Sequence, residues 1–352
     1  MIRFLLIIFI IPFANADQYF YLSKKSENLI EQYLLKDNGD LHLLNQLGIP
    51  GGPGGLTLSP DGKHLYFSIS NESSSELGTA LIGDQGKLTF LGKAAIASGG
   101  SGTISRCGRF YFKYNYKANT VSVLEMKDNL HTGRQFQEIT TTKNPHDIGV
   151  SNDGALVFVP HNGHNRLYQF SLNADSGKLQ PLSTPYIEGA KFEDKGFSAF
   201  RSLAFHPHKN VLYCTYEKGG GLASLKYDEN GVKLWQEFST VDEGVHVLPT
   251  TVVLSPNNEF LFTPNRGTKK KKSPTSITTF RLDPQSGEVI SRVGTFEIPA
   301  KGPRGIIVDK SGGFLFTSSV KTDMTYQFKI NKDGSLKLFK EHKIGSGSML
   351  IL

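Results

Sequence analysis

Short stretches of alternating apolar residues recur along this chain, and each follows a tight polar turn. One copy reads Ser151-Asn152-Asp153-Gly154 and is followed by Leu156-Val157-Phe158-Val159. The six such turns begin at Ser59, Ser105, Ser151, His206, Ser255 and Asp309, and are 46, 46, 55, 49 and 54 residues apart. A repeat of this length is typical of a four-stranded propeller blade with its loops.

A second turn completes each repeat. Strand-like segments such as 166–170 and 277–280 are followed by Asp- and Gly-containing turns at 173–177 and 283–287. Asp, Asn and Gly supply the positive φ that tight hairpins need. No window has sustained helical periodicity, so the pattern predicts an all-β chain with four antiparallel strands per blade.

The two ends of the sequence predict one more blade. Residues 348–352 form a single apolar segment, whereas 19–22 and 29–34 look like strands that lack an innermost partner. Pairing the ends would close the ring and remove exposed strand edges. We therefore expect seven blades rather than six or eight, in a single domain.

The first sixteen residues have the pattern of a signal peptide. Arg3 precedes an apolar run from Phe4 to Phe13, and Ala14-Asn15-Ala16 offers a small-residue cleavage site. The run is shorter than the ~20 residues that span a bilayer. We predict a signal peptide at 1–16, a propeller domain at 17–352, a secreted or periplasmic location and no later membrane span. An uncleaved anchor is the alternative.

Cysteine content and charge add two expectations. Cys107 and Cys214 lie two blades apart in the repeat, too far for a disulfide, so both are expected to be reduced, with Cys214 in a core strand. Much of the net charge of +7 sits in Lys269–Lys272, which we interpret as a solvated loop. No nucleic-acid motif accompanies these lysines, so we expect no nucleic-acid partner, and we expect a monomer.

Blade topology brings a set of polar residues to one mouth of the central channel. The tight turns lie on one face, so the longer connections share the other, where functional residues are common. Before innermost strands stand His146, Arg201 and Arg304, and after second strands stand Asn115, His161, Glu217 and Arg266.

This cluster favours hydrolysis or proton transfer on an anionic substrate. Arginines bind carboxylates in a fixed fork and stabilise oxyanion charge. Glu217 or His146 would act as general base, and the residues alone leave that choice open. No metal-ligand spacing, nucleophile elbow or phosphate-binding loop is present, so we predict chemistry without a metal or cofactor.

At these residues the chain resembles the seven-bladed lactonase propellers, which include 6-phosphogluconolactonases and carboxy-muconate lactonizing enzymes. The matching motifs are Pro145-His146, Arg201-Ser202-Leu203-Ala204-Phe205-His206-Pro207 with Tyr216-Glu217, Asn265-Arg266-Gly267, Pro303-Arg304-Gly305 and Gly345-Ser346-Gly347-Ser348. The resemblance implies catalytic roles for His146, Arg201 and Glu217. It implies substrate binding by Arg266 and Arg304, and we add His161 and Asn115 as candidates.

Two departures from the family pattern affect the substrate. Ser101 stands where a histidine is usual, and His161 stands where an aspartate is usual. Because a phosphorylated gluconolactone is cytosolic, the predicted leader favours an unphosphorylated sugar lactone or another lactone. The alternatives are a muconate-type lactonizing cycloisomerase and a non-catalytic extracytoplasmic binding propeller.

Overall fold

The computed structural model describes residues 18–71, 74–96, 101–189, 191–192, 196–268 and 273–352. The predicted leader at 1–16 and the lysines 269–272 lie outside these ranges. Within them, strands dominate, and the helical elements are two three-residue 3-10 turns, η1 (Lys25–Glu27) and η2 (Asp84–Gly86).

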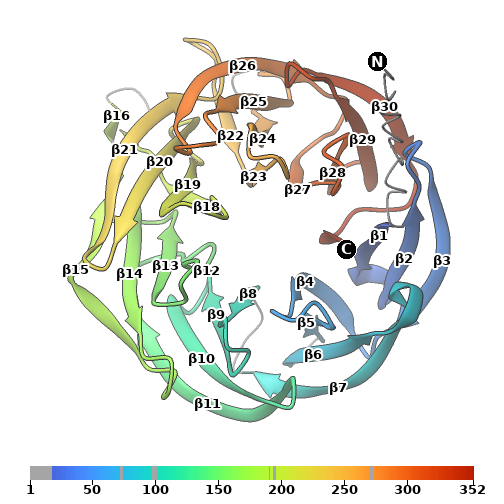
Figure 1. Cartoon of the computed structure of the whole chain (residues 1–352), viewed down its shortest axis with the longest axis vertical. Coiled ribbons are helices and arrows are strands. Elements are labelled where there is room, and N and C mark those ends of the chain that lie inside the picture. Colours follow the sequence, from blue (N-terminus) through green and yellow to red (C-terminus); the bar gives the residue numbers. More distant parts are fainter. Residues whose placement is uncertain (1–17, 72–73, 97–100, 190, 193–195, 269–272) are drawn as a thin grey trace, which may run out of the picture.

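Seven antiparallel sheets stand around a central channel, as the sequence predicts (Figure 1). From the channel outward, blade 1 consists of β4 (Gly52–Leu58), β5 (His64–Ser70), β6 (Ser75–Ile82) and β7 (Leu88–Ile96). Blade 2 consists of β8 (Gly102–Ile104), β9 (Phe110–Asn115), β10 (Thr120–Lys127) and β11 (Leu130–Thr140). Blade 3 consists of β12 (Gly149–Val150), β13 (Leu156–His161), β14 (Arg166–Leu172) and β15 (Leu179–Glu188).

The second half of the ring repeats this order. A small hairpin, β16 (Lys191–Phe192) and β17 (Gly196–Phe197), precedes blade 4, which consists of β18 (Phe200–Phe205), β19 (Val211–Tyr216), β20 (Gly221–Asp228) and β21 (Gly231–Ser239). Blade 5 has an innermost strand split into β22 (Val247–Pro249) and β23 (Val253–Leu254), followed by β24 (Phe260–Gly267), β25 (Ser276–Leu282) and β26 (Val289–Glu297). Blade 6 consists of β27 (Pro303–Val308), β28 (Phe314–Ser319), β29 (Met324–Ile330) and β30 (Leu336–His342).

The seventh blade joins the two ends of the chain. Its innermost strand is β31 (Met349–Ile351), followed outward by β1 (Gln18–Lys24), β2 (Leu29–Leu35) and β3 (Leu41–Gly48). Phe20 pairs with Ile351 and Leu22 pairs with Met349. Position 347 requires a glycine, because a Cβ there would lie 1.8 Å from the backbone oxygen of Ser23 and would clash with it. The predicted closure is confirmed, and it gives β1 a partner on its channel side.

The repeated serine turns fix the hairpins between the two inner strands. In blade 3 the Ser151 hydroxyl donates to Asp153 over 2.5 Å and accepts from the Leu156 amide over 2.9 Å. Ser59 makes the same pair of contacts in blade 1. The turn glycine, Gly154, has a φ of 77°, which other residues rarely adopt.

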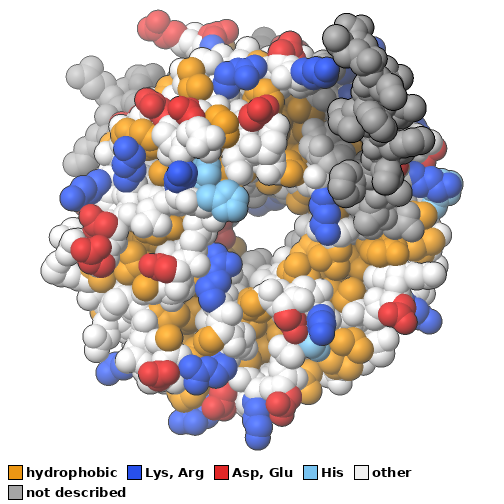
Figure 2. Space-filling view, viewed as in Figure 1, with side chains coloured by type: hydrophobic (Ala, Val, Ile, Leu, Met, Phe, Trp, Pro, Cys, Tyr) orange, Lys and Arg blue, Asp and Glu red, His pale blue; other side chains and the backbone are white. Residues whose placement is uncertain are grey.

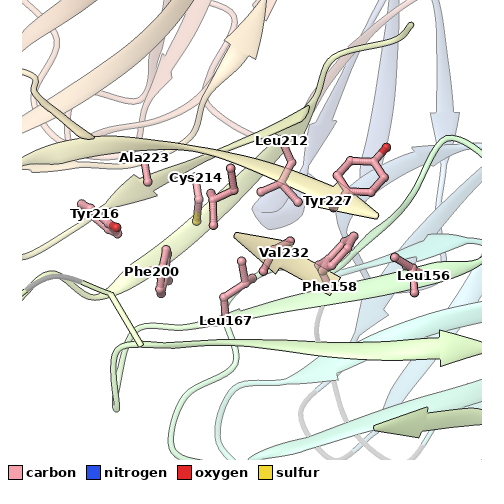
Figure 3. Packing of buried hydrophobic residues seen from close by; sticks show 11 residues of the cluster. Leu156, Phe158, Leu167, Phe200, Leu212, Cys214, Tyr216, Ala223, Tyr227 and Val232 are labelled. Atoms are coloured by element: carbon pink, nitrogen blue, oxygen red, sulfur yellow. The ribbon is translucent and has the colours of Figure 1, made fainter. Parts of the chain in front are cut away.

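The core lies between neighbouring blades rather than at the centre of the ring. Figure 3 shows one such layer, in which Phe158 and Leu167 of blade 3 face Phe200 and Leu212 of blade 4. Each large apolar side chain buried in this way contributes about 1.5–3 kcal/mol to folding. The packing fixes each blade against its neighbours and therefore sets the positions of the loops at the channel mouth.

The ring encloses an open channel, and basic and histidine side chains border it in the view of Figure 2. Both cysteines are free, and Cys214 is buried in β19, as predicted. In the described part of the chain, every helix is too short to span a membrane.

Candidate active site

The innermost strands of the site-bearing blades are interrupted where they reach the mouth. In β18, Phe200 pairs with Tyr216, and pairing resumes only at Leu203. In β27 the same gap separates Pro303 from Ile306. Such β-bulges re-aim side chains, and they carry Arg201 and Arg304. We expected these arginines just before the inner strands; that detail was wrong, because both lie within the strands, in the bulges.

Blade 3 carries His146 in an equivalent position. Pro145 forms an isolated bridge with His161, and regular pairing starts only at Gly149. The residues between them make separate hydrogen bonds instead of regular strand pairs. One is a 2.8 Å hydrogen bond from the His146 amide to the Pro160 carbonyl.

The position where the second strand of each blade ends determines which residue begins the following connection. In every blade, the first residue after the last pair of second and third strands lies in the connection on the face of the ring that carries the site. Because side chains alternate along a strand, this residue and the last paired one point in opposite directions. The seven residues in this position are Lys25, Asn71, Tyr116, Asn162, Glu217, Arg266 and Val320.

Glu217 is the centre of an ion-pair network. Its Oε2 accepts hydrogen bonds from Arg201 Nη1 and from Asn162 Nδ2, each over 2.8 Å. Its Oε1 accepts from Nη2 of Arg266. Burial by itself would raise the pKa of Glu217, but the charges of Arg201 and Arg266 outweigh it and lower this pKa to about 2. Glu217 is therefore ionised at neutral pH, with both oxygens engaged.

Arg201 and Arg266 retain donors beyond this network. Arg201 is only 4% exposed. Among the described residues, the buried Nε atoms of Arg201 and Arg266 have no hydrogen-bond partner. A buried N–H without a partner is costly, so these atoms favour an anionic ligand or bound water beside the network.

His146 is the neutral group beside these charges. Its imidazole meets the ring of Tyr116 edge to face, with centroids 5.6 Å apart. Burial, reinforced by the charge of Arg201, lowers the pKa of His146 to about 3. No other described side chain hydrogen-bonds its ring nitrogens, so the neutral imidazole can accept a proton.

Asp147 is a site residue that sequence reasoning missed. Its Oδ2 accepts from the Ser202 hydroxyl over 3.1 Å and from the Leu203 amide over 2.9 Å, which ties blade 3 to the bulge that carries Arg201. Burial raises the pKa of Asp147, against the effect of these hydrogen bonds. The residue was inconspicuous because it follows His146 directly and resembles a solvated loop acid.

The structure does not bring His161 and Asn115 to this cluster. His161 is fully buried, and its ring nitrogens contact the Val159 carbonyl at 2.9 Å and the Thr141 hydroxyl at 2.8 Å. Burial lowers the pKa of His161 to about 4. The Asn115 side chain accepts from the Ala118 amide in its own turn. Both are last paired residues, and their substrate-binding roles stay predictions that we do not carry further.

Three of the remaining candidates line one cavity of about 430 Å³. His146, Arg201 and Arg304 line it together, so three of the predicted residues meet at one mouth. Glu217 and Arg266 are not among the lining residues: Glu217 contacts the lining residue Arg201, and Arg266 contacts Glu217. The other lining residues, which the sequence analysis did not assign to the site, are Ser23, Lys25, Pro53, Gly54, Ser101, Tyr114, Thr251, Gly305, Ser318, Val320, Ser346, Gly347 and Ser348.

The cavity has the electrostatics of an anion site. Arg201, Arg304 and the exposed Lys25 line it, whereas the nearby carboxylate of Glu217 is balanced by two arginines. Low-dielectric walls concentrate such a field. Across the described residues, no three His, Cys, Asp or Glu side chains converge in the manner of a metal site.

The fold and this mouth define a lactonase-type propeller. Residues 20–351 match the family described as lactonase, 7-bladed beta-propeller, and the chain belongs to that family. The 6-phosphogluconolactonase of Yersinia pestis (strain Pestoides F) is 26% identical over 347 residues, covering 95% of this chain and 97% of the relative. The 6-phosphogluconolactonase of Yersinia enterocolitica is 25% identical over 346 residues, with the same coverage.

Among solved structures, the periplasmic gluconolactonase of Pseudomonas aeruginosa is similar in shape. It matches with a TM-score of 0.85 at 19% identity, covering 96% of this chain and 99% of that one. At this identity the likeness supports the fold alone.

Proposed function

We propose that this protein is a metal-independent lactonase that hydrolyses a sugar lactone at the channel mouth. The observation that carries the proposal is the meeting of a neutral imidazole, His146, with a buried guanidinium, Arg201, in one cavity. The names of the curated relatives support the same reaction class.

In the proposed reaction, His146 accepts a proton from water as the water oxygen attacks the lactone carbonyl carbon. Arg201 donates to the developing oxyanion, with Arg304 beside it. The tetrahedral intermediate collapses by breaking the ring C–O bond, and the leaving alkoxide takes the proton back from His146. The net change is addition of one water to give a hydroxy acid, whose carboxylate suits the cationic mouth.

We propose that Glu217 has a positioning role rather than a role in proton transfer. Both of its oxygens are engaged by cationic or amide donors, so neither oxygen is free to take a proton from water. Its proposed role is to hold Arg201 and Arg266 in fixed orientations. His146 lines the cavity, and no other described side chain hydrogen-bonds its ring nitrogens, so it is the better-placed base.

A muconate-type cycloisomerization is the second candidate. Two guanidinium groups, those of Arg201 and Arg304, line the same cavity and would suit the two carboxylates of such a substrate. Muconates absorb in the ultraviolet, so a fall in absorbance on incubation with the protein would identify this reaction.

We also propose that the protein acts outside the cytoplasm. The apolar segment at residues 4–13 with Ala14-Asn15-Ala16 supports this location, and so does the periplasmic gluconolactonase of similar fold. An unphosphorylated sugar lactone is the substrate class that such a location favours.

The test is hydrolysis of a panel of lactones by purified protein in the presence of a chelator. The proposal expects a rate above that of buffer on at least one sugar lactone, and large losses in Arg201→Ala and Glu217→Gln. Rates no faster than buffer on every lactone would overturn it.

A further inference from the structure

The wall of the cavity combines charged and hydroxyl side chains. His146 and Arg201 stand on blades 3 and 4, Arg304 stands on blade 6, and Lys25 stands on blade 7. Five serines line the cavity from blade 6 through blade 7 to blade 2. These five, which we call the serine arc, are Ser23, Ser101, Ser318, Ser346 and Ser348. The innermost strands β31, β4 and β8 follow one another around the ring beside this part of the channel (Figure 1).

The serine arc is a built structure, held by contacts that cross blades. The Ser318 hydroxyl donates to the Gly347 carbonyl over 3.0 Å. Ser348 donates its amide to the Ser23 hydroxyl and accepts from the Gly55 amide, each over 3.0 Å. Gly55, with a φ of +61°, packs against Ser101 so closely that a Cβ would lie 2.5 Å from its Oγ.

These contacts leave four of the five hydroxyls with unused hydrogen-bonding capacity. Ser23 and Ser348 accept hydrogen bonds from amides, so their O–H groups remain to donate. Ser318 and Ser346 donate, to Gly347 and Asp323 respectively, so their oxygen lone pairs remain to accept. An arc that offers both donors and acceptors suits the hydroxyl groups of a sugar, which do both.

We propose that the serine arc is the subsite for the hydroxyl-bearing carbons of a polyhydroxylated lactone, and that it sets specificity for such lactones over hydroxyl-free ones. This inference rests on the proposed lactonase function and deepens it. In this proposal the arginines hold the carbonyl or carboxylate end, and the serine arc distinguishes a sugar lactone from a simple aliphatic one.

Ser346 offers the cleanest substitution. Both its amide and its hydroxyl contact Asp323 Oδ1 over 2.9 Å, so Ser346→Ala removes the hydroxyl and leaves the amide contact in place. Ser335 is a matched control, because its amide and hydroxyl contact Asp333 Oδ1 in the same way, in a tight turn outside the cavity.

The experiment is calorimetric binding of two hydroxy acids, D-gluconate and 5-hydroxyvalerate, to wild type, Ser346→Ala, Ser318→Ala and Ser335→Ala. We expect gluconate to bind wild type more tightly. Each serine-arc variant should weaken the affinity for gluconate about three- to ten-fold, the effect of one hydrogen bond, and should leave the affinity for 5-hydroxyvalerate unchanged. The Ser335→Ala control should bind both acids as wild type does. Arg304→Gln should weaken both ligands alike.

Two outcomes overturn the inference: wild type fails to bind gluconate, or the serine-arc variants weaken both acids equally or neither. Retained binding of 5-hydroxyvalerate shows in each variant that the cavity is folded and that its arginines still bind a carboxylate. Failure of the proposed function appears separately, as hydrolysis no faster than buffer on every lactone, while the binding result stands by itself.

Discussion

The guanidinium of Arg201 donates from Nη1 to Oε2 of Glu217 over 2.8 Å. Arg201 lies in the bulge of an innermost strand, and Glu217 follows the second strand of the same blade. Arg266, from the next blade, contacts the other carboxylate oxygen. One carboxylate therefore orients two arginines that reach the mouth from different blades.

Glu217→Gln should destabilise the protein by about 3 kcal/mol, because it leaves buried guanidinium charge without its partner. Urea unfolding measures this change. Glu188→Gln is the control, since the pair of Glu188 with Arg166 is exposed and worth about 1 kcal/mol or less. Equal effects of the two substitutions would contradict the buried network.

Arg201→Lys should lower kcat on the substrate lactone by about 100-fold or more, because lysine keeps the charge but loses the planar fork aimed at the oxyanion. Steady-state kinetics measures the loss. A variant with wild-type kcat would show that Arg201 does not contact the reacting carbonyl.

Asp147→Asn should reduce activity about ten-fold, since the new amide group would face the Ser202 hydroxyl and the Leu203 amide, both of which donate to Asp147. The estimate corresponds to loss of about one hydrogen bond in the support of Arg201. We expect the loss in kcat rather than in KM, because Asp147 acts through the bulge. A change confined to KM would argue against this role.

Much of the fold could be predicted from the sequence, but only part of the site could be predicted. The turn spacing predicted the blades, and the apolar ends predicted the closure between β1 and β31. The direction in which side chains point at the ends of strands was harder to predict. His161 and Asn115 were chosen, but their neighbours Asn162 and Tyr116 reach the mouth, because a shift of one residue reverses the face. Counting apolar alternation to the end of each strand would have found them.

The serine arc was out of reach for another reason. Ser23 and Ser348 become neighbours only through closure of the ring, and serine is common in solvated loops. The sequence marked Ser101 as a departure and Ser346 as part of a matching motif, but no pattern in the chain indicates that their hydroxyls share a cavity.

The pH dependence of stability should report on His146. In the unfolded chain this imidazole takes up a proton near pH 6.5, whereas in the native protein burial lowers its pKa to about 3. Unfolded molecules therefore bind more protons in that window, and stability falls as pH falls from 6.5 towards 3. His146→Gln should show a shallower fall, measured as melting temperature against pH.

His164→Gln is the control for this measurement, because His164 is exposed in the neighbouring connection. Its profile should follow that of wild type. A fall as steep in His146→Gln as in wild type would mean that the native imidazole is freely protonated.

Gly347→Ala should weaken ring closure, because its Cβ would clash with the backbone oxygen of Ser23. Overpacking of this kind costs about 1–3 kcal/mol, which a lower midpoint in urea would reveal. Gly92→Ala is the matched control: Gly92 lies within β7, and no atom would lie within 4 Å of its Cβ. Equal midpoints would contradict the tight approach of β31 to β1.

The most direct test of the central claim is the initial rate of D-glucono-1,5-lactone hydrolysis with chelator present, for wild type, His146→Gln and His164→Gln. The account predicts a wild-type rate well above that of buffer, retained in His164→Gln and reduced at least about 100-fold in His146→Gln, the lower range for loss of a general base. A His146→Gln rate equal to wild type would contradict the assignment of the chemistry to this mouth.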